Sequence, residues 1–196
     1  MDKKEIQEQR MKQYFIQATK EILRSEGLKN VSVRNIAEKA GYSYATLYNY
    51  FKDAKDLVFE CVRDFQQECR EFIESEIDGA NEGTERIRSI NLAYVKYFVQ
   101  YPGIFELFYL EKTSDLAHKQ PTVQMINNFL DHVTDKDWQI AIAQQKIEKE
   151  GVSLLQTQIK FFIVGLLVSY INRRLEVDYP EIMTMVDNHL SYLLEL

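Results

Sequence analysis

The chain has 196 residues, of which 45% are apolar, and a formal net charge of −6 at pH 7. This length suits a small module joined to a larger body, and the apolar fraction is enough for a buried core. Only three prolines and seven glycines occur, which is too little turn-forming sequence for a protein of many short strands. We therefore expect an all-α protein of about nine to ten helices.

The negative charge is unevenly distributed along the chain. Residues 1–60 hold 11 Lys and Arg against 9 Asp and Glu, whereas residues 61–196 hold 13 against 21. Phosphate binding needs local positive potential, and the mildly basic N-terminal part can supply it. This asymmetry is modest, so by itself it is weak evidence for a nucleic-acid partner.

Disulfide-stabilised, secreted and membrane-spanning classes are disfavoured. Cys61 and Cys69 lie on one predicted helix, about 12 Å apart, which is too far for a disulfide. Residues 2–5 are charged, unlike a signal peptide. The longest apolar stretch, residues 161–171, is shorter than the roughly 20 residues that span a bilayer. We expect a cytoplasmic protein with no membrane partner.

The first predicted elements are one long helix and two short ones. Apolar residues at helical spacing predict a helix over residues 5–26. Two short helices follow over residues 33–40 and 44–50, with Ser32 and Ser43 placed as their N-caps. The two short helices therefore meet across a tight turn.

Further helices account for the remaining sequence. Residues 53–77 carry one apolar stripe on a long helix, and the polar stretch 78–85 is the best candidate loop. Helical patterns then cover residues 86–100, 103–113, 120–133, 136–150, 152–174 and 180–195. We expect a three-helix head over residues 1–52 and a larger helical body over residues 53–196.

Residues 32–51 supply the parts of a DNA-binding helix-turn-helix, in which the outer face of the second helix enters the major groove. On that helix Leu47 and Phe51 point inward at about 100° per residue. The opposite face carries Ala45, Tyr48, Asn49 and Lys52. Such a face suits close approach to base edges, and Asn49 can pair with an adenine, although a solvated polar side chain is the alternative.

The same stretch resembles the N-terminal signature of the TetR (tetracycline-repressor) family of transcription regulators. In that signature an apolar-Arg-x-Ile-Ala-x-x-Ala-Gly turn is followed by Ser-x-x-Thr-Leu-Tyr-x-Tyr-Phe. The matching residues are Val33, Arg34, Ile36, Ala37, Ala40, Gly41, Ser43, Thr46, Leu47, Tyr48, Tyr50, Phe51 and Leu57. The resemblance covers about 50 N-terminal residues. It implies a DNA-binding regulator, usually a repressor that a small-molecule effector releases from a palindromic operator.

The resemblance also implies which residues contact DNA. Arg34 and Tyr44 are expected near bases or adjacent phosphates, and Thr46, Tyr48 and Tyr50 at the backbone, with packing as the alternative for Tyr48 and Tyr50. The expected set is Arg34, Tyr42, Ser43, Tyr44, Ala45, Thr46, Tyr48, Asn49, Tyr50, Lys52 and Lys55.

Two positions depart from the family pattern. Ala54 stands where the family commonly has a lysine, so either Lys52 or Lys55 is expected to make that phosphate contact. Tyr42 stands where a small aliphatic residue is usual, and it either reaches DNA or packs on the head.

The last two predicted helices are candidates for a dimer interface. Residues 152–174 are apolar nearly all round, so several sides of this helix must be covered, and Gly165 and Ser169 would let another helix approach closely. The resemblance implies a four-helix bundle formed with a second copy. The expected interface is Phe161, Val164, Gly165, Val168, Ser169, Ile182, Val186, Leu190 and Leu193. Ordinary core of a single chain is the alternative.

Aromatic side chains are concentrated in the middle of the chain. They are expected to line an apolar effector pocket, with plain core as the alternative for each residue. The predicted lining is Phe65, Phe72, Tyr94, Tyr97, Phe98, Phe105, Phe108, Tyr109, Met125, Phe129 and Phe162.

No catalytic, metal-binding or cofactor motif is found in the sequence. Histidines occur only at His118, His132 and His189, and the first two lie about 21 Å apart if one helix joins them. We expect no enzyme, metal or cofactor. A helical dimer that serves as a protein-partner or ligand-carrier module is the alternative function, against which the near-complete head motif argues.

Overall fold

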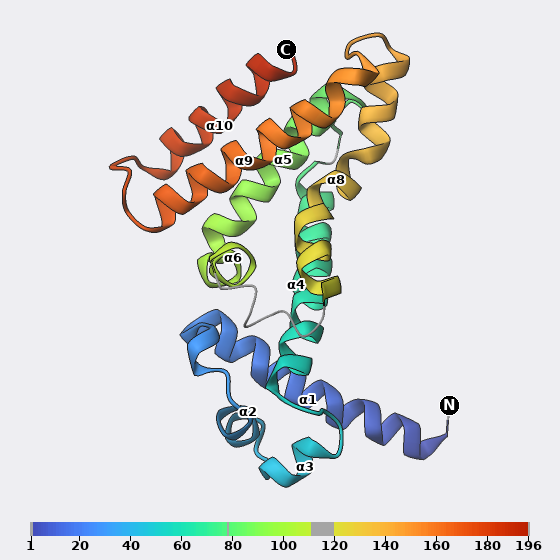
Figure 1. Ribbon diagram of the computed structural model, residues 1–196, viewed down its shortest axis with the longest axis vertical. Coiled ribbons are helices and arrows are strands. Elements are labelled where there is room, and N and C mark those ends of the chain that lie inside the picture. Colours follow the sequence, from blue (N-terminus) through green and yellow to red (C-terminus); the bar gives the residue numbers. More distant parts are fainter. Residues whose placement is uncertain (1, 78, 111–119, 196) are drawn as a thin grey trace. The chain divides into compact units, whose positions relative to one another are not determined.

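The computed structural model describes residues 2–77, 79–110 and 120–195, with side chains except at 120–122 (Figure 1). Every regular element in these ranges is helical, as the sequence predicts. The α-helices are α1 (Lys3–Glu26), α2 (Val33–Ala40), α3 (Tyr44–Tyr48), α4 (Ala54–Glu76), α5 (Thr84–Gln100), α6 (Pro102–Tyr109), α8 (Gln120–Ala143), α9 (Val152–Ile171) and α10 (Tyr179–Leu193). Short 3₁₀ turns occur at Leu28–Asn30 and Lys149–Gly151.

The helices form two compact units. The head unit comprises the described parts of residues 1–66 and 101–126, and the body unit those of residues 67–100 and 127–196. Helix α4 contributes to both units, and so does α8. The division after residue 52 stays a prediction.

An aromatic cluster fills the centre of the head unit. Phe15 of α1 is fully buried, and its ring centroid lies 5.7 Å from that of Tyr42, 6.2 Å from Tyr50 and 6.4 Å from Phe51. Rings at these separations pack favourably beyond the area that they bury. This cluster therefore ties α1 to the two ends of the short helix α3.

The turn between α2 and α3 depends on a glycine. Gly41 has φ +75° and ψ 25°, the left-handed conformation that other L-residues adopt at a cost of about 1–2 kcal/mol. The next residue, Tyr42, donates its backbone N–H to the Ala37 carbonyl at 2.9 Å, which closes α2. Ser43 then caps α3 by accepting from the Thr46 N–H at 3.1 Å. The predicted turn and both predicted caps are confirmed, because Ser32 likewise accepts from the Asn35 N–H.

In the body unit α5 packs against α9 and α10. Ile182, Val186 and Leu190 of α10 are completely buried. The start of α5 is tied to α8 because Asp137, 3% exposed, accepts the Gly83 N–H at 3.0 Å and lies 3.8 Å from Arg86.

The prediction of separate helices at 120–133 and 136–150 is wrong. Helix α8 is continuous over Gln120–Ala143, and its ladder passes through Thr134, whose hydroxyl donates to the Leu130 carbonyl and accepts from Trp138 Nε1. The helix ends instead where Gln145 takes φ +57°. Lys146 then donates its N–H to the Ala141 carbonyl at 3.0 Å. The end of predicted helix 103–113 lies outside the described residues.

Candidate nucleic-acid interface

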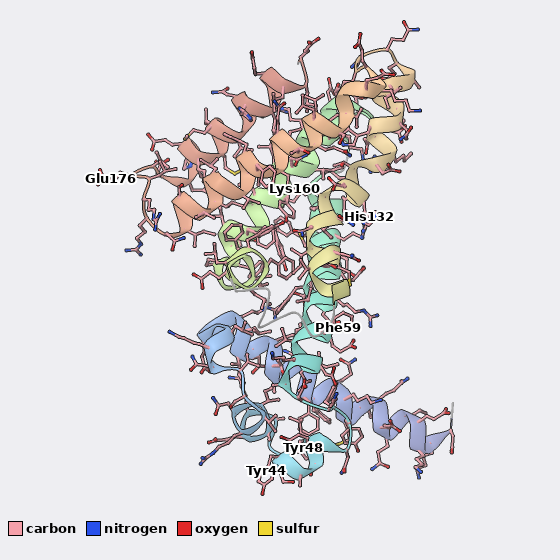
Figure 2. All side chains as sticks on the ribbon, viewed as in Figure 1. Tyr44, Tyr48, Phe59, His132, Lys160 and Glu176 are labelled. Atoms are coloured by element: carbon pink, nitrogen blue, oxygen red, sulfur yellow. The ribbon has the colours of Figure 1, made fainter. Side chains whose placement is uncertain are left out.

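Helix α3 divides into a buried face and an exposed face. Leu47 is fully buried and the following Phe51 is 8% exposed, so both anchor the helix in the head. Tyr44 is 65% exposed and Tyr48 55% exposed. Figure 2 labels both tyrosines on α3. Because they are four residues apart, they share one face of the helix.

The other residues expected at DNA are exposed or half-buried. Arg34, Ser43, Ala45, Asn49 and Lys52 are exposed, and Thr46, Tyr50 and Lys55 are half-buried. The Ser43 and Thr46 hydroxyls lie 2.9 Å apart and hydrogen bond to each other. Helix α3 ends at Tyr48, so Asn49 is its C-cap rather than part of a longer recognition helix.

The structure bears on the two departures from the family pattern. Tyr42 packs on the head, with its ring centroid 6.0 Å from that of Tyr14, and yet keeps 38% exposure. Lys52 is more exposed than Lys55, and its backbone N–H donates to Asp56 Oδ2 at 3.2 Å, just before α4 begins. Lys52 is therefore the freer of the two side chains to reach a phosphate.

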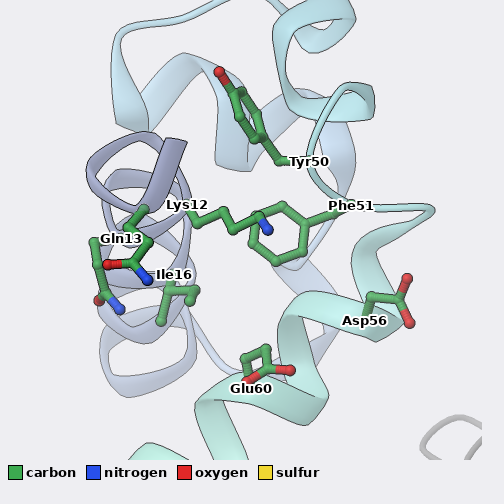
Figure 3. A pocket seen from close by; sticks show the side chains of 8 residues that line it. Lys12, Gln13, Ile16, Tyr50, Phe51, Asp56 and Glu60 are labelled. Atoms are coloured by element: carbon green, nitrogen blue, oxygen red, sulfur yellow. The ribbon is translucent and has the colours of Figure 1, made fainter. Parts of the chain in front are cut away.

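A polar groove on the head unit was not predicted from the sequence. Its volume is about 550 Å³, and it lies between α1, the segment after α3 and the first turns of α4 (Figure 3). It is lined by Gln9, Lys12, Gln13, Ile16, Tyr50, Phe51, Asp56 and Glu60. The lining comes from three separate segments, so no local motif indicates it.

The residues predicted to line an effector pocket are distributed over both units. In the body unit Tyr94 contacts Phe98 and Phe129, with ring centroids 4.7 and 5.9 Å away, and Tyr97 contacts Phe72 at 5.7 Å. Phe162 is apart from these contacts because it stacks on His189 at 3.7 Å. The head unit holds Phe65, Phe105, Phe108, Tyr109 and Met125. Most of the set is buried, and Phe72, Tyr109, Met125 and Phe162 are half-buried.

The residues predicted for a dimer interface divide by burial. Phe161 is 70% exposed, Gly165 is exposed, and Val164, Val168, Ser169 and Leu193 are half-buried. Ile182, Val186 and Leu190 have no exposed surface, because they pack inside their own chain. Side chains that are already buried cannot cover a partner, so α10 offers Met185 and Tyr192 instead.

Helix α9 leaves much of its apolar surface uncovered. By length and composition alone, the helical stretch over residues 149–171 could cross a membrane. It is longer than the apolar stretch over residues 161–171 that the sequence alone indicates. Only 22% of the most apolar window of this helix is buried within the described chain. One such helix is weak evidence for a membrane, and an uncovered apolar helix equally fits contact with another protein surface.

The remaining reactive side chains offer little chemistry in the described parts of the chain. Cys61 and Cys69 are buried, and burial raises the pKa of both thiols, so neither is a thiolate near neutral pH. His132 is exposed on α8, and burial lowers the pKa of His189. His118 lies outside the described residues. Within them, no group of three or more His, Cys, Asp or Glu is placed to hold a metal ion.

Comparison with known proteins places the head in a family. Residues 15–61 match the model of the bacterial regulatory proteins of the tetR family. These residues include the whole helix-turn-helix and the aromatic cluster around Phe15. No curated protein sequence matches the chain.

Solved structures match over nearly the whole chain. The fatty acid degradation regulator FadR from Bacillus halodurans is 15% identical, with a TM-score of 0.72 and 94% of each chain covered. FadR from Bacillus subtilis, in complex with stearoyl-CoA, is 16% identical, with a TM-score of 0.72, and covers 93% of this chain and 97% of its own. A TetR family transcription regulator from Marinobacter aquaeolei is 19% identical, with a TM-score of 0.59, covering 93% and 94%.

The helix-turn-helix head and the helical body together form the architecture of a TetR-type transcription regulator. Residues 15–61 are thus similar to the tetR-family regulatory proteins, and the whole chain shares the fold of solved TetR-family regulators.

Proposed function

We propose that the protein is a repressor that binds a palindromic operator as a homodimer and leaves it when a small molecule binds in the body unit. The observation that carries this proposal is the outer face of α3. Tyr44 and Tyr48 are more than half exposed, whereas Leu47 of the same helix is fully buried. Large aromatic side chains that are exposed on a short helix suit contact with a partner, and in a helix-turn-helix that partner is DNA.

The effect of removing these tyrosines tests the DNA-binding part of the proposal. A duplex is first selected from a random-sequence library by the wild-type chain, and its affinity is measured by mobility shift. Tyr44→Ala and Tyr48→Ala are each expected to lower that affinity about 10-fold or more, since one side-chain contact with DNA is worth about 1–3 kcal/mol. Tyr48→Phe, which keeps the ring, serves as the control for packing. The proposal would be contradicted if the wild-type chain enriched no sequence from the library, or if both alanine variants bound the selected duplex with unchanged affinity.

A second copy of the chain is the proposed cover for α9 and α10, which lie side by side in the body unit (Figure 1). On α9 Leu154 is 62% and Phe161 70% exposed, seven residues apart and so on one face. On α10 Met185 and Tyr192 repeat this spacing at 40% and 81% exposure. Gly165 has nothing within 4 Å of a Cβ position, which leaves room for a close helix. A two-fold pair of these helices makes a four-helix bundle.

The proposed effector is a small apolar or amphipathic molecule held among the aromatic residues of the body unit. Tyr94, Tyr97, Phe98 and Phe129 are buried there in ring contact with one another, where an apolar chain would be desolvated. The FadR structure from Bacillus subtilis holds stearoyl-CoA. Stearoyl-CoA is therefore the first probe for this chain.

Helix α4 is the proposed connection between effector and operator, because its residues 54–66 belong to the head unit and the rest to the body unit. Displacement of α4 would change the separation of the two α3 helices from the ~34 Å between successive major-groove faces. Saturating stearoyl-CoA is expected to raise the melting temperature and to weaken operator binding about 5- to 150-fold, the usual range of such coupling. Unchanged melting and unchanged operator affinity would contradict this class of effector.

A further inference from the structure

The first turns of α1 carry a segregated positive face. Lys3, Gln7, Arg10 and Tyr14 recur at spacings of four, three and four residues. At 3.6 residues per turn these positions fall within about 60° of the helix circumference. We call these four residues the α1 stripe. All four are exposed, and neither Lys3 nor Arg10 has an ion-pair partner among the described residues.

The acidic residues of the same turns point elsewhere and are already engaged. Glu5 and Glu8 fall about 100° or more from every member of the α1 stripe. Glu5 Oε2 accepts from the Asp2 backbone N–H at 2.9 Å, in the capping box that starts the helix. Glu8 pairs with Lys12 at 3.1 Å. The α1 stripe therefore presents two uncompensated positive charges.

The α1 stripe is continuous with the DNA-binding face of the head unit. Its last member, Tyr14, lies against Tyr42 with ring centroids 6.0 Å apart. Tyr42 directly precedes the capping Ser43 and the exposed Tyr44. Toward the N-terminus, Arg10 lies about one helical turn from Tyr14, and Lys3 lies about 16 Å from Tyr14 along the helix axis. The positive charges thus extend the α3 face along α1 toward its free end.

We propose that the α1 stripe binds the phosphate backbone of the operator duplex beside the half-site that α3 occupies. The inference rests on the proposed DNA-binding function and adds a contact surface outside the helix-turn-helix. Duplex DNA presents one negative charge per about 1.7 Å of its axis, so a row of cations beside a docked recognition helix meets phosphates of the same duplex. Contacts of this kind set register and add affinity without reading sequence.

The salt dependence of operator binding tests the α1 stripe. The slope of log Kobs against log salt concentration falls in magnitude by about 0.9 for each phosphate that the protein no longer neutralises. The double variant Lys3→Gln with Arg10→Gln is expected to lower that magnitude by about 1.8 per chain, and by about 3.6 for a dimer on a palindrome. Both side chains are exposed, so the melting temperature should not change.

The matched control is Lys12→Gln, which removes one positive charge from the opposite face of α1, in the groove of Figure 3. Its salt slope is expected to equal that of the wild type. Equal slopes for the wild type and the double variant, on a duplex that the wild type binds steeply, would overturn the inference alone. Failure of the wild type to select or bind any duplex would overturn the proposed function as well.

Discussion

Phe161→Glu is expected to convert the protein from a dimer into a monomer. Phe161 is 70% exposed within its own chain, so the fold of the single chain should tolerate the change. In the proposed bundle the same position is covered by the second copy. A buried carboxylate without a partner is destabilising by about 3–5 kcal/mol, which weakens dimerisation by roughly 100-fold or more.

Sedimentation measures this change directly, and a mobility shift with the selected duplex measures its consequence. The variant should bind the operator more weakly because it loses the linkage between two half-sites. Gln139→Glu, at an exposed position on α8, adds the same charge on a helix that is not part of the proposed bundle and serves as the control. If the Phe161→Glu variant still sedimented as a dimer, the proposal that α9 forms the dimer interface would be contradicted.

Phe15→Ala is expected to cause the largest loss of stability in the head. Phe15 is fully buried, with the rings of Tyr42, Tyr50 and Phe51 around it. Truncation of a buried phenylalanine side chain lowers the free energy of unfolding by about 3–5 kcal/mol, because apolar burial is removed and a cavity is left behind. Since the cluster holds both ends of α3, DNA binding should fall together with stability.

Urea unfolding followed by circular dichroism gives the magnitude. Tyr44→Ala is the comparison, because Tyr44 is 65% exposed and its removal should change the free energy of unfolding by less than about 0.5 kcal/mol. The two variants thus separate unfolding of the head from removal of a DNA contact. Both are expected to weaken DNA binding, and only Phe15→Ala is expected to unfold at a lower urea concentration than the wild type. A destabilisation below about 1 kcal/mol in Phe15→Ala would show that the aromatic cluster does not hold the head together.

The head was predictable because its signals are local. The side chains of Ser32 and Ser43 each cap a helix by accepting a hydrogen bond from the backbone N–H three residues later. Gly41 supplies a backbone conformation that few other residues adopt. The spacing of Leu47 and Phe51 fixes the buried face of α3. Each of these features needs only a few neighbouring residues to be recognised.

The end of α8 was not predictable from such signals. The chain leaves the helix at Gln145, which adopts a left-handed conformation without being a glycine. A second feature hid the continuity of the helix: the hydroxyl of Thr134 bonds back to Leu130 inside the helix, although threonine commonly favours caps and turns. Because this hydroxyl also accepts from Trp138 Nε1, both hydrogen bonds of Thr134 run along the helix and leave it unbroken.

The surfaces were harder to predict than the elements. Ile182, Val186 and Leu190 have the spacing of an interface stripe, and periodicity cannot distinguish a face that meets its own chain from one that meets a partner. Met185 and Tyr192 lie on an adjacent face of the same helix, and only their exposure in the structure distinguishes that face from the buried one. The contact between Tyr14 and Tyr42 and the groove beside Lys12 likewise join segments that are distant in sequence.

The sequence of the DNA that the wild-type chain selects, together with the number of chains bound to it, tests the central claim most directly. Two chains per duplex, on an inverted repeat whose half-sites are about one helical turn or a multiple of it apart, is the predicted result. Binding that falls steeply with salt should accompany it. No enriched sequence, or one chain on an asymmetric site, would contradict a two-fold regulator that presents α3 to the major groove.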